Sequence, residues 1–240
     1  MKVYLNEITG IADAITSMYY SKRTWRRAKE DEIRTVCNNV LSSDGCFIGT
    51  GSEAENKAYT GWMTTLVKWG CIHPTMLRFI DLSFTVEGLH RAGQDDWDAH
   101  AKRFNNRIIR SSTRLAEFGA ELSSWYQGKV IPTDTALELL GINLPETTTR
   151  EGIPFVRTTG GYIREDLADD KDVKRGLYTL GIPSNFTYKV DVVEFAHVYK
   201  ERNVNGTAHP EVKELCERST DLIQEYQPWF NRELLLAIKN

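Results

Sequence analysis

Hydrophobic and polar positions alternate in two early stretches of the chain, which predicts strands there. The alternation is clearest in Phe79–Val86 (FIDLSFTV), and the first ten residues (MKVYLNEITG) show it too. Apolar residues at helical spacing predict helices over Ala12–Trp25, Glu30–Leu41, Lys57–Trp69, Val190–Arg202 and Glu211–Tyr226. Pro210 suits the first turn of the last helix, where its missing N–H costs nothing.

The middle of the chain predicts shorter elements. Thr135–Leu140 predicts a short helix, and Ile153–Arg164 (IPFVRTTGGYIR) predicts a hairpin that bends at Thr-Gly-Gly. Asp166–Asp172 predicts a second short helix, and Leu177–Ile182 a strand. No repeat or linker interrupts these elements. We therefore expect one α+β domain over residues 1–240, with a small, mostly antiparallel sheet flanked by long helices.

The segment Asp95–Arg114 carries the most informative polar pattern. Four arginines fall at i, i+4, i+7 and i+11: Arg103, Arg107, Arg110 and Arg114. An apolar stripe lies beside them: Trp97, Ala101, Phe104, Ile108 and Leu115. The pattern predicts one helix running on through Phe118 toward Trp125. Its guanidinium groups either bind phosphate or carboxylate, or form a solvated face balanced by nearby acids.

The composition of the chain indicates which kinds of binding partner to expect. The chain has 240 residues, 41% of them hydrophobic and 26% charged, so it can bury a core. The net charge of −3 argues against nucleic-acid binding by bulk charge. Four scattered cysteines indicate reduced thiols. No apolar run reaches membrane-spanning length and no signal-peptide pattern opens the chain, so we expect a cytoplasmic protein without a membrane partner.

Other reactive side chains leave alternatives open. The histidines lack paired metal-ligand spacing, so we predict no metal site. Three aspartates precede the arginines: Asp95, Asp96 and Asp98. They are acid/base groups, or they favour the helix dipole and pair with Lys102 and Arg103. Cys46 or Cys71 is either a nucleophile for pyrimidine C6 or a structural thiol.

Three segments follow one another in an order that a known family shares. His73 precedes the strand at 79–86, the arginine segment follows, and Glu201-Arg202 precedes Ala208, His209 and Glu211. This order resembles the flavin-dependent thymidylate synthases. Their signature R-H-R-x-x-S-x-x-x-x-S-x-R-Y is followed near the end by L-R and A-Q-x-E-I-R. The likeness spans residues 57–115 and 174–235 and is absent from 133–165.

The signature is altered in this chain. Laid on Asp98–Ser111, it retains Arg110 but replaces the leading Arg-His with Asp98-Ala99. A shift by one helical turn instead matches Ser112-Thr113-Arg114 to S-x-R, and both registers remain open. Asp98 would repel an anionic pyrophosphate by about 1–4 kcal/mol at contact distance.

The resemblance implies a site for deoxyuridine monophosphate and for FAD. The nucleotide would be held by Arg110, Arg175 and Arg202, with Asn105, Ser112 and Arg114 beside them. Arg202 and Asn106 would take part in catalysis. The flavin would contact His100, Arg103, Asp191 and His197. It further implies a homotetramer with active sites shared between subunits.

Three functions are compatible with these residues. A flavin-dependent enzyme would transfer one carbon from methylenetetrahydrofolate to C5 and complete the methyl group of thymidylate with a hydride. A flavin-free enzyme would let water quench the same intermediate and give a 5-hydroxymethyl nucleotide. A non-catalytic paralogue would only bind the nucleotide.

Overall fold

The computed structural model describes residues 1–21, 27–99, 107–111, 122–131, 133–158, 160–170, 173, 177 and 180–239. Its strands are β1 (Lys2–Thr9), β2 (Asp81–His90), β3 (Arg107–Arg110), β4 (Thr147–Arg150), β5 (Ile153–Thr158), β6 (Gly161–Arg164) and β7 (Pro183–Asp191). Its α-helices are α1 (Ile11–Tyr20), α2 (Arg27–Val40), α3 (Glu53–Gly70), α4 (Arg91–Asp98), α5 (Thr133–Leu139), α7 (Val192–Tyr199), α8 (Pro210–Tyr226) and α9 (Arg232–Ala237). Shorter helical turns are η1 (Pro74–Phe79), η2 (Glu165–Leu167) and the π-helix η4 (Lys200–Val204). The predicted α+β class is confirmed.

The chain forms two compact units, each built from several segments. The larger comprises Lys2–Val86, Asp95–Ile109 and Thr187–Asn240, and the smaller comprises Met1, Glu87–Gln94 and Arg110–Phe186. Four strands form a sheet in the order β1-β2-β7-β3, and three more form a sheet in the order β4-β5-β6. The single domain over residues 1–240 stays a prediction.

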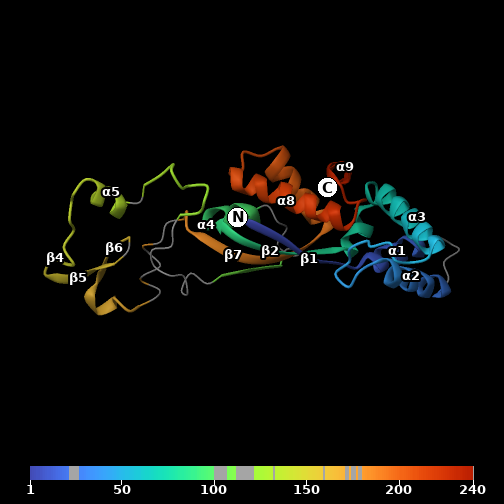
Figure 1. Cartoon of the computed structure of the whole chain (residues 1–240), viewed down its shortest axis with the longest axis horizontal. Helices are drawn as coiled ribbons and strands as arrows, with labels where there is room; N and C mark the ends of the chain where they lie inside the picture. The colour runs from blue at the N-terminus through green and yellow to red at the C-terminus, as the bar shows by residue number, and fades with distance from the viewer. Residues whose placement is uncertain are drawn as a thin grey trace. The chain divides into compact units, whose positions relative to one another are not determined.

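The core of the larger unit is built from alternate residues of its strands, which point to the same face of the sheet. Leu82, Phe84 and Val86 on β2 are fully buried, whereas the residues between them are half-buried. Phe84 stacks on Tyr188 of β7 with 4.8 Å between ring centroids. Helix α8 packs along β1, as Figure 1 shows. One face of this sheet therefore carries the apolar core, as expected for a half-buried antiparallel sheet.

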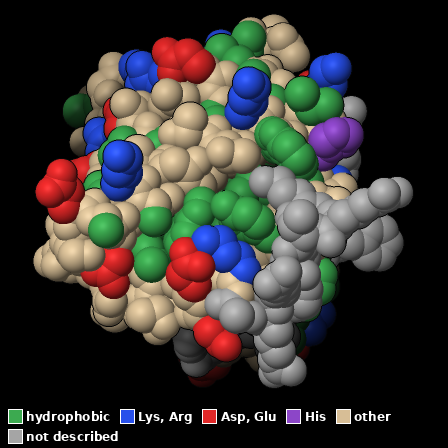
Figure 2. Space-filling view, turned by 90° about the vertical axis from the view of Figure 1, so that its right-hand side faces the viewer, with side chains coloured by type: hydrophobic (Ala, Val, Ile, Leu, Met, Phe, Trp, Pro, Cys, Tyr) green, Lys and Arg blue, Asp and Glu red, His purple; other side chains and the backbone are tan. Residues whose placement is uncertain are grey.

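Helices α1, α2 and α3 pack against one another in the larger unit. Helix α3 begins with a capping box in which Ser52 and Glu55 each accept a hydrogen bond from the other's backbone N–H. Tyr59 on α3 is buried and donates a hydrogen bond of 2.9 Å to Gln227. On the outer face at this end, charged side chains of both signs lie scattered among apolar ones (Figure 2). Among the described residues, no helix is both long and apolar enough to cross a membrane.

The smaller unit confirms the predicted hairpin. β5 pairs antiparallel with β6, and Thr158 lies opposite Gly161 at the bend. β4 adds a third strand, which the polar sequence TTTR does not signal. Of the described residues in β4, β5 and β6, only Ile163 is buried. This sheet thus buries little apolar surface of its own.

The predicted arginine helix is wrong. α4 ends at Asp98, and Arg107–Arg110 form strand β3 beside β7. Two adjacent β-branched residues, Ile108 and Ile109, favour a strand, and pairing with β7 outweighs the helical spacing of the charges. Arg107 and Arg110 are three positions apart on a strand, so their side chains point to opposite faces. The two arginines therefore do not share one face.

A second correction concerns the segment before β7. The strand predicted over Leu177–Ile182 is wrong at positions 180–182, which form a turn, and β7 begins only at Pro183. Gly181 lies against Leu122 within the smaller unit, since a Cβ there would come within 3.1 Å of the Leu122 side chain.

Candidate functional site

Arg202 is a buried arginine in a widened helical turn. Helix α7 continues into the π-helix Lys200–Val204, which is closed by a hydrogen bond of 2.8 Å from the Asn205 amide to the Lys200 carbonyl. The Arg202 residue is only 7% exposed. π-Helical turns inside α-helices are frequent at functional sites because they redirect side chains. The turn therefore makes Arg202 a candidate functional residue.

The partner of Arg202 is Asp96. Arg202 Nη1 donates to Asp96 Oδ1 at 2.8 Å, and the two side chains are 9% and 31% exposed. Within the described residues, Arg202 Nε makes no hydrogen bond although it is buried. The carboxylate thus neutralises a guanidinium whose remaining donors are not all used. This pairing differs from the Lys102 and Arg103 partners considered for the aspartates.

Packing next to Asp96 fixes its position. Trp97 is 2% exposed, and its ring lies 5.2 Å from the Tyr188 ring and 6.4 Å from the Phe195 ring. The C-terminal half of α4 is therefore anchored against β7 and α7. Because Asp96 is the neighbour of Trp97 on this helix, the same packing holds its carboxylate toward the π-helix.

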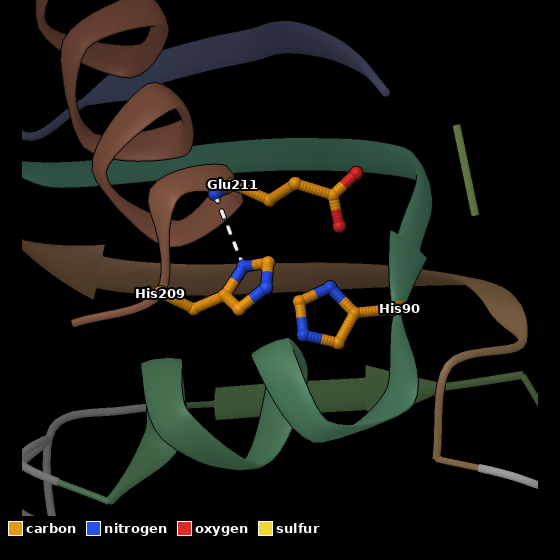
Figure 3. A group of neighbouring side chains, drawn as sticks. All are labelled: His90, His209 and Glu211. Atoms are coloured by element: carbon orange, nitrogen blue, oxygen red, sulfur yellow. Dashed lines mark hydrogen bonds between the residues drawn. The ribbon is translucent and has the colours of Figure 1, made fainter. Parts of the chain in front are cut away.

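The loop after the π-helix approaches it closely. A Cβ on Gly206 would lie 2.1 Å from the Glu201 carbonyl oxygen, so only glycine fits. The loop leads to His209, whose Nδ1 accepts a hydrogen bond of 3.2 Å from the Glu211 amide and caps α8 (Figure 3). His90, drawn in the same figure, ends β2 and lies edge-on to Tyr126 in the smaller unit. His209, at the position of the family's glutamine, has a capping role.

Arg110 lies in the smaller unit and is half-buried at the end of β3. Its Nη2 donates to the Gln94 carbonyl at 3.2 Å. Gln94 is fully buried, and its Oε1 has no hydrogen-bond partner among the described residues. The next residue, Ser111, donates its amide to the Asn185 carbonyl at 2.8 Å. The Arg110 side chain is thus held by the backbone carbonyl of Gln94, and its strand by the backbone of Asn185. Gln94 is a buried polar residue that the sequence did not single out.

Asp191 caps α7. Its Oδ1 accepts a hydrogen bond of 2.8 Å from the Glu194 amide, and the residue is 4% exposed. Burial raises the pKa of the Asp191 carboxyl, partly offset by this hydrogen bond and by Arg78. His197 is half-buried on the same helix. The flavin contacts expected of both residues stay predictions.

The four cysteines are free thiols in unfavourable surroundings for a nucleophile. Burial raises the pKa of Cys37 to about 12, and it raises the pKa of Cys46, Cys71 and Cys216 as well. Because the thiolate is the reactive form, a raised pKa makes these thiols weaker nucleophiles near neutral pH. The structural alternative for Cys46 and Cys71 is thus favoured.

An open cavity of about 290 Å³ lies over the outer face of the larger sheet, beside β3. Its two cations are paired with carboxylates: Arg107 with Asp81 at 2.8 Å, and Lys189 with Glu7 at 3.1 Å. Among the described residues that line it, the cavity therefore offers an anion no uncompensated positive charge.

Several predicted site residues lie outside the described part of the chain: His100, Arg103, Asn105, Asn106, Ser112, Arg114 and Arg175. Arg110 belongs to the smaller unit and Arg202 to the larger. The convergence of Arg110, Arg175 and Arg202 on one phosphate thus stays a prediction.

The fold is shared with proteins of known structure. The chain has the fold of the flavin-dependent thymidylate synthases, and the likeness runs along nearly its whole length. Thymidylate synthase X from Helicobacter pylori, crystallised with FAD and dUMP, matches 98% of this chain and 100% of its own at a TM-score of 0.53 and 14% identity. The UMP/dUMP methylase PolB from Streptomyces cacaoi, crystallised with 5-Br dUMP, matches 99% of this chain and 95% of its own at a TM-score of 0.53 and 12% identity. No protein-family model and no curated protein matches the sequence.

Proposed function

We propose that this protein binds a pyrimidine deoxynucleoside monophosphate and transfers a one-carbon unit from methylenetetrahydrofolate to C5 of its base. Two proteins with the same fold were crystallised with dUMP or its 5-bromo analogue. The observation that carries the proposal is Arg202, a buried guanidinium set in a π-helix at the position where the resemblance expects the base-contacting arginine. dUMP, giving thymidylate, is the substrate and product that the resemblance implies.

Arg202 is the group we propose for activating the base. When a uracil base loses its N3 proton, negative charge is shared between that ring nitrogen and the carbonyl oxygens, and C5 attacks the methylene carbon more readily. A guanidinium held in a poorly hydrated place stabilises such charge more strongly than water does. No thiolate is needed at C6, which agrees with the raised pKa values of the cysteines. Arg110 and Arg175 would hold the phosphate, with Asn105, Ser112 and Arg114 nearby and Asn106 at the base.

The described residues support flavin binding less well than nucleotide binding. Bound FAD would supply the hydride that turns the transferred methylene into a methyl group. Of the four residues expected to contact it, only two are described: Asp191, which caps a helix, and the half-buried His197. A carboxylate at Asp191 and another at Asp98 do not fit an anionic pyrophosphate. The described residues therefore assign no catalytic step to a flavin.

These carboxylates favour a flavin-free reaction as a second candidate. The C5–CH₂ bond forms while the methylene leaves the folate nitrogen, and the C5 proton is lost. Water then adds hydroxide to the exocyclic methylene. The products are a 5-hydroxymethyl nucleotide and tetrahydrofolate, and the reaction requires no reductant.

Product analysis separates the candidates. The purified protein is incubated with dUMP or dCMP and methylenetetrahydrofolate, and the nucleotides are identified by mass spectrometry. A 5-methyl product together with yellow protein supports the flavin reaction, and a 5-hydroxymethyl product from colourless protein supports the second candidate. Arg202→Gln should abolish turnover, whereas Arg34→Gln, which breaks exposed pairs with Asp13 at 2.7 Å and Glu30 at 3.0 Å, should not. Unmodified nucleotides in every reaction would contradict the proposal of catalysis.

We also propose that the protein is a cytoplasmic homotetramer whose subunits share active sites, as the resemblance implies. Light scattering of the purified protein measures the assembly directly. A monomer that retains turnover would contradict shared sites.

A further inference from the structure

The ion pair between Asp96 and Arg202 has a donor and acceptor pattern that distinguishes pyrimidines. We propose that this pair selects a cytosine nucleotide, so that deoxycytidine monophosphate rather than deoxyuridine monophosphate is the preferred ligand. This inference rests on the proposed function, which places the base at Arg202.

The order of hydrogen-bonding groups follows from which atoms pair. Asp96 Oδ1 accepts from Nη1 of Arg202, so the carboxylate lies at one end of the guanidinium. The second carboxylate oxygen is an acceptor, and the remaining N–H groups of Arg202 are donors. Along one edge, the pair therefore presents an acceptor followed by donors.

Cytosine has the complementary order. Its edge carries the 4-amino donor, then the acceptors N3 and O2, and carboxylates recognise the 4-amino group of cytosine in known complexes. Uracil carries an acceptor, the N3–H donor and a second acceptor. To bind it, the protein would need an acceptor between two donors, which a carboxylate at the end of a guanidinium cannot provide. The N3–H of uracil would instead face an N–H of Arg202.

Exposure and packing make the pair suited to recognition. The Asp96 side chain is 31% exposed, so a ligand can reach it, whereas Arg202 is 9% exposed and firmly held. Trp97 anchors the helix that carries Asp96, and Gly206 keeps the following loop against the π-helix that carries Arg202. A site preorganised in this way discriminates strongly, because the wrong base leaves buried polar groups unpaired.

The test is calorimetric titration of the whole protein with dCMP and with dUMP. We expect the wild type to bind dCMP about 10-fold or more tightly than dUMP, since each specific base contact contributes roughly this factor. Asp96→Asn keeps the size of the side chain but presents an amide, and it should lower the dCMP preference by about 10- to 100-fold. The matched control is Asp221→Asn, which breaks an Asp–Arg pair of 2.8 Å elsewhere in the larger unit and should leave the preference unchanged. The ratio of two affinities is a readout that a purely structural salt bridge would not alter.

A second variant keeps the test decisive if Asp96→Asn fails to fold. Asp96→Glu preserves the charge beside Arg202 but moves the carboxylate by one methylene, so the preference for dCMP should fall while the protein stays folded. Wild-type protein that binds dUMP as tightly as dCMP, or a folded Asp96 variant with an unchanged preference, would overturn the inference and leave the proposed function standing. Wild-type protein that binds neither nucleotide would overturn both.

Discussion

The Asp191 carboxylate is a buried group whose stability contribution depends on pH. It is 4% exposed and accepts one hydrogen bond from the Glu194 amide. Because burial raises its pKa in the folded state, the folded protein holds this proton more tightly than the unfolded chain does. The stability from this group is complete below its unfolded pKa, and it is lost as the pH rises through the folded pKa.

Two substitutions separate the effect of the Asp191 charge on stability from the effect of its N-cap hydrogen bond. Asp191→Asn keeps a good N-cap acceptor and removes the ionisation, so the variant should match the wild type near pH 4 and exceed it in stability near pH 8, the window set by an unfolded pKa of about 3.9. Asp191→Ala removes the cap as well and should cost about 1 kcal/mol relative to Asp191→Asn at every pH. In a chain of this size, that difference lowers Tm by about 2–4 °C.

Thermal unfolding followed by circular dichroism across this pH range measures both effects. The difference between wild type and Asp191→Asn should grow with pH, whereas the difference between the Asn and Ala variants should stay constant. A wild type that becomes more stable than Asp191→Asn as the pH rises would refute the burial argument. It would indicate a carboxylate whose charged form is stabilised by partners in the native state.

Three further predictions concern the surroundings of Arg202 and the thiols. Trp97→Ala should destabilise the protein by about 3–5 kcal/mol in denaturant titrations, since it removes a buried aromatic anchor; a loss below about 1 kcal/mol would be incompatible with that packing. Gly206→Ala should weaken nucleotide binding in calorimetry, because a Cβ would collide with the Glu201 carbonyl and move the π-helix; unchanged affinity and Tm would contradict this. Cys71→Ser should leave turnover within about 2-fold of wild type, because its thiol is protonated; complete loss in a folded variant would restore Cys71 as a nucleophile.

Amphipathic periodicity predicted much of the larger unit. The apolar spacing predicted α2, α3 and α8 to within a few residues, and Pro210 indeed opens α8. These segments bury one face against a core, so their local pattern and their tertiary environment agree. The strand β2 was predicted for the same reason, since its alternating residues are buried.

The arginine segment shows where this reasoning fails. The arginines lie at helical spacing but place no face in the core, so their spacing constrains the backbone weakly. At positions 107–110 the helix expected from the arginines and the apolar stripe beside them is replaced by a strand. Residues 107–110 instead pair with β7, a partner that lies far along the chain. The strand β7 could have been found, because Phe186, Tyr188 and Val190 alternate with polar positions and are buried. Tertiary pairing of this kind is not encoded in a short window of sequence.

The site was predicted only in part. Arg202 was found through the order of its neighbouring motifs, but its partner Asp96 lies 202 − 96 = 106 positions away, and no local pattern connects them. The π-helix that directs Arg202 inward has no sequence signature, since KERNV is an ordinary polar stretch. Gln94 likewise became notable only through its complete burial. Contacts between distant segments decide such features.

Calorimetric titration of Arg202→Gln beside the wild type tests the central claim most directly. We predict that the wild type binds a pyrimidine deoxynucleoside monophosphate and that the variant binds it about 100-fold or more weakly, as expected when a buried, hydrogen-bonded charge is removed. Arg34→Gln, which alters an exposed arginine elsewhere in the larger unit, should bind like the wild type. A wild type that binds no such nucleotide, or a folded Arg202→Gln that binds it unchanged, would contradict the account.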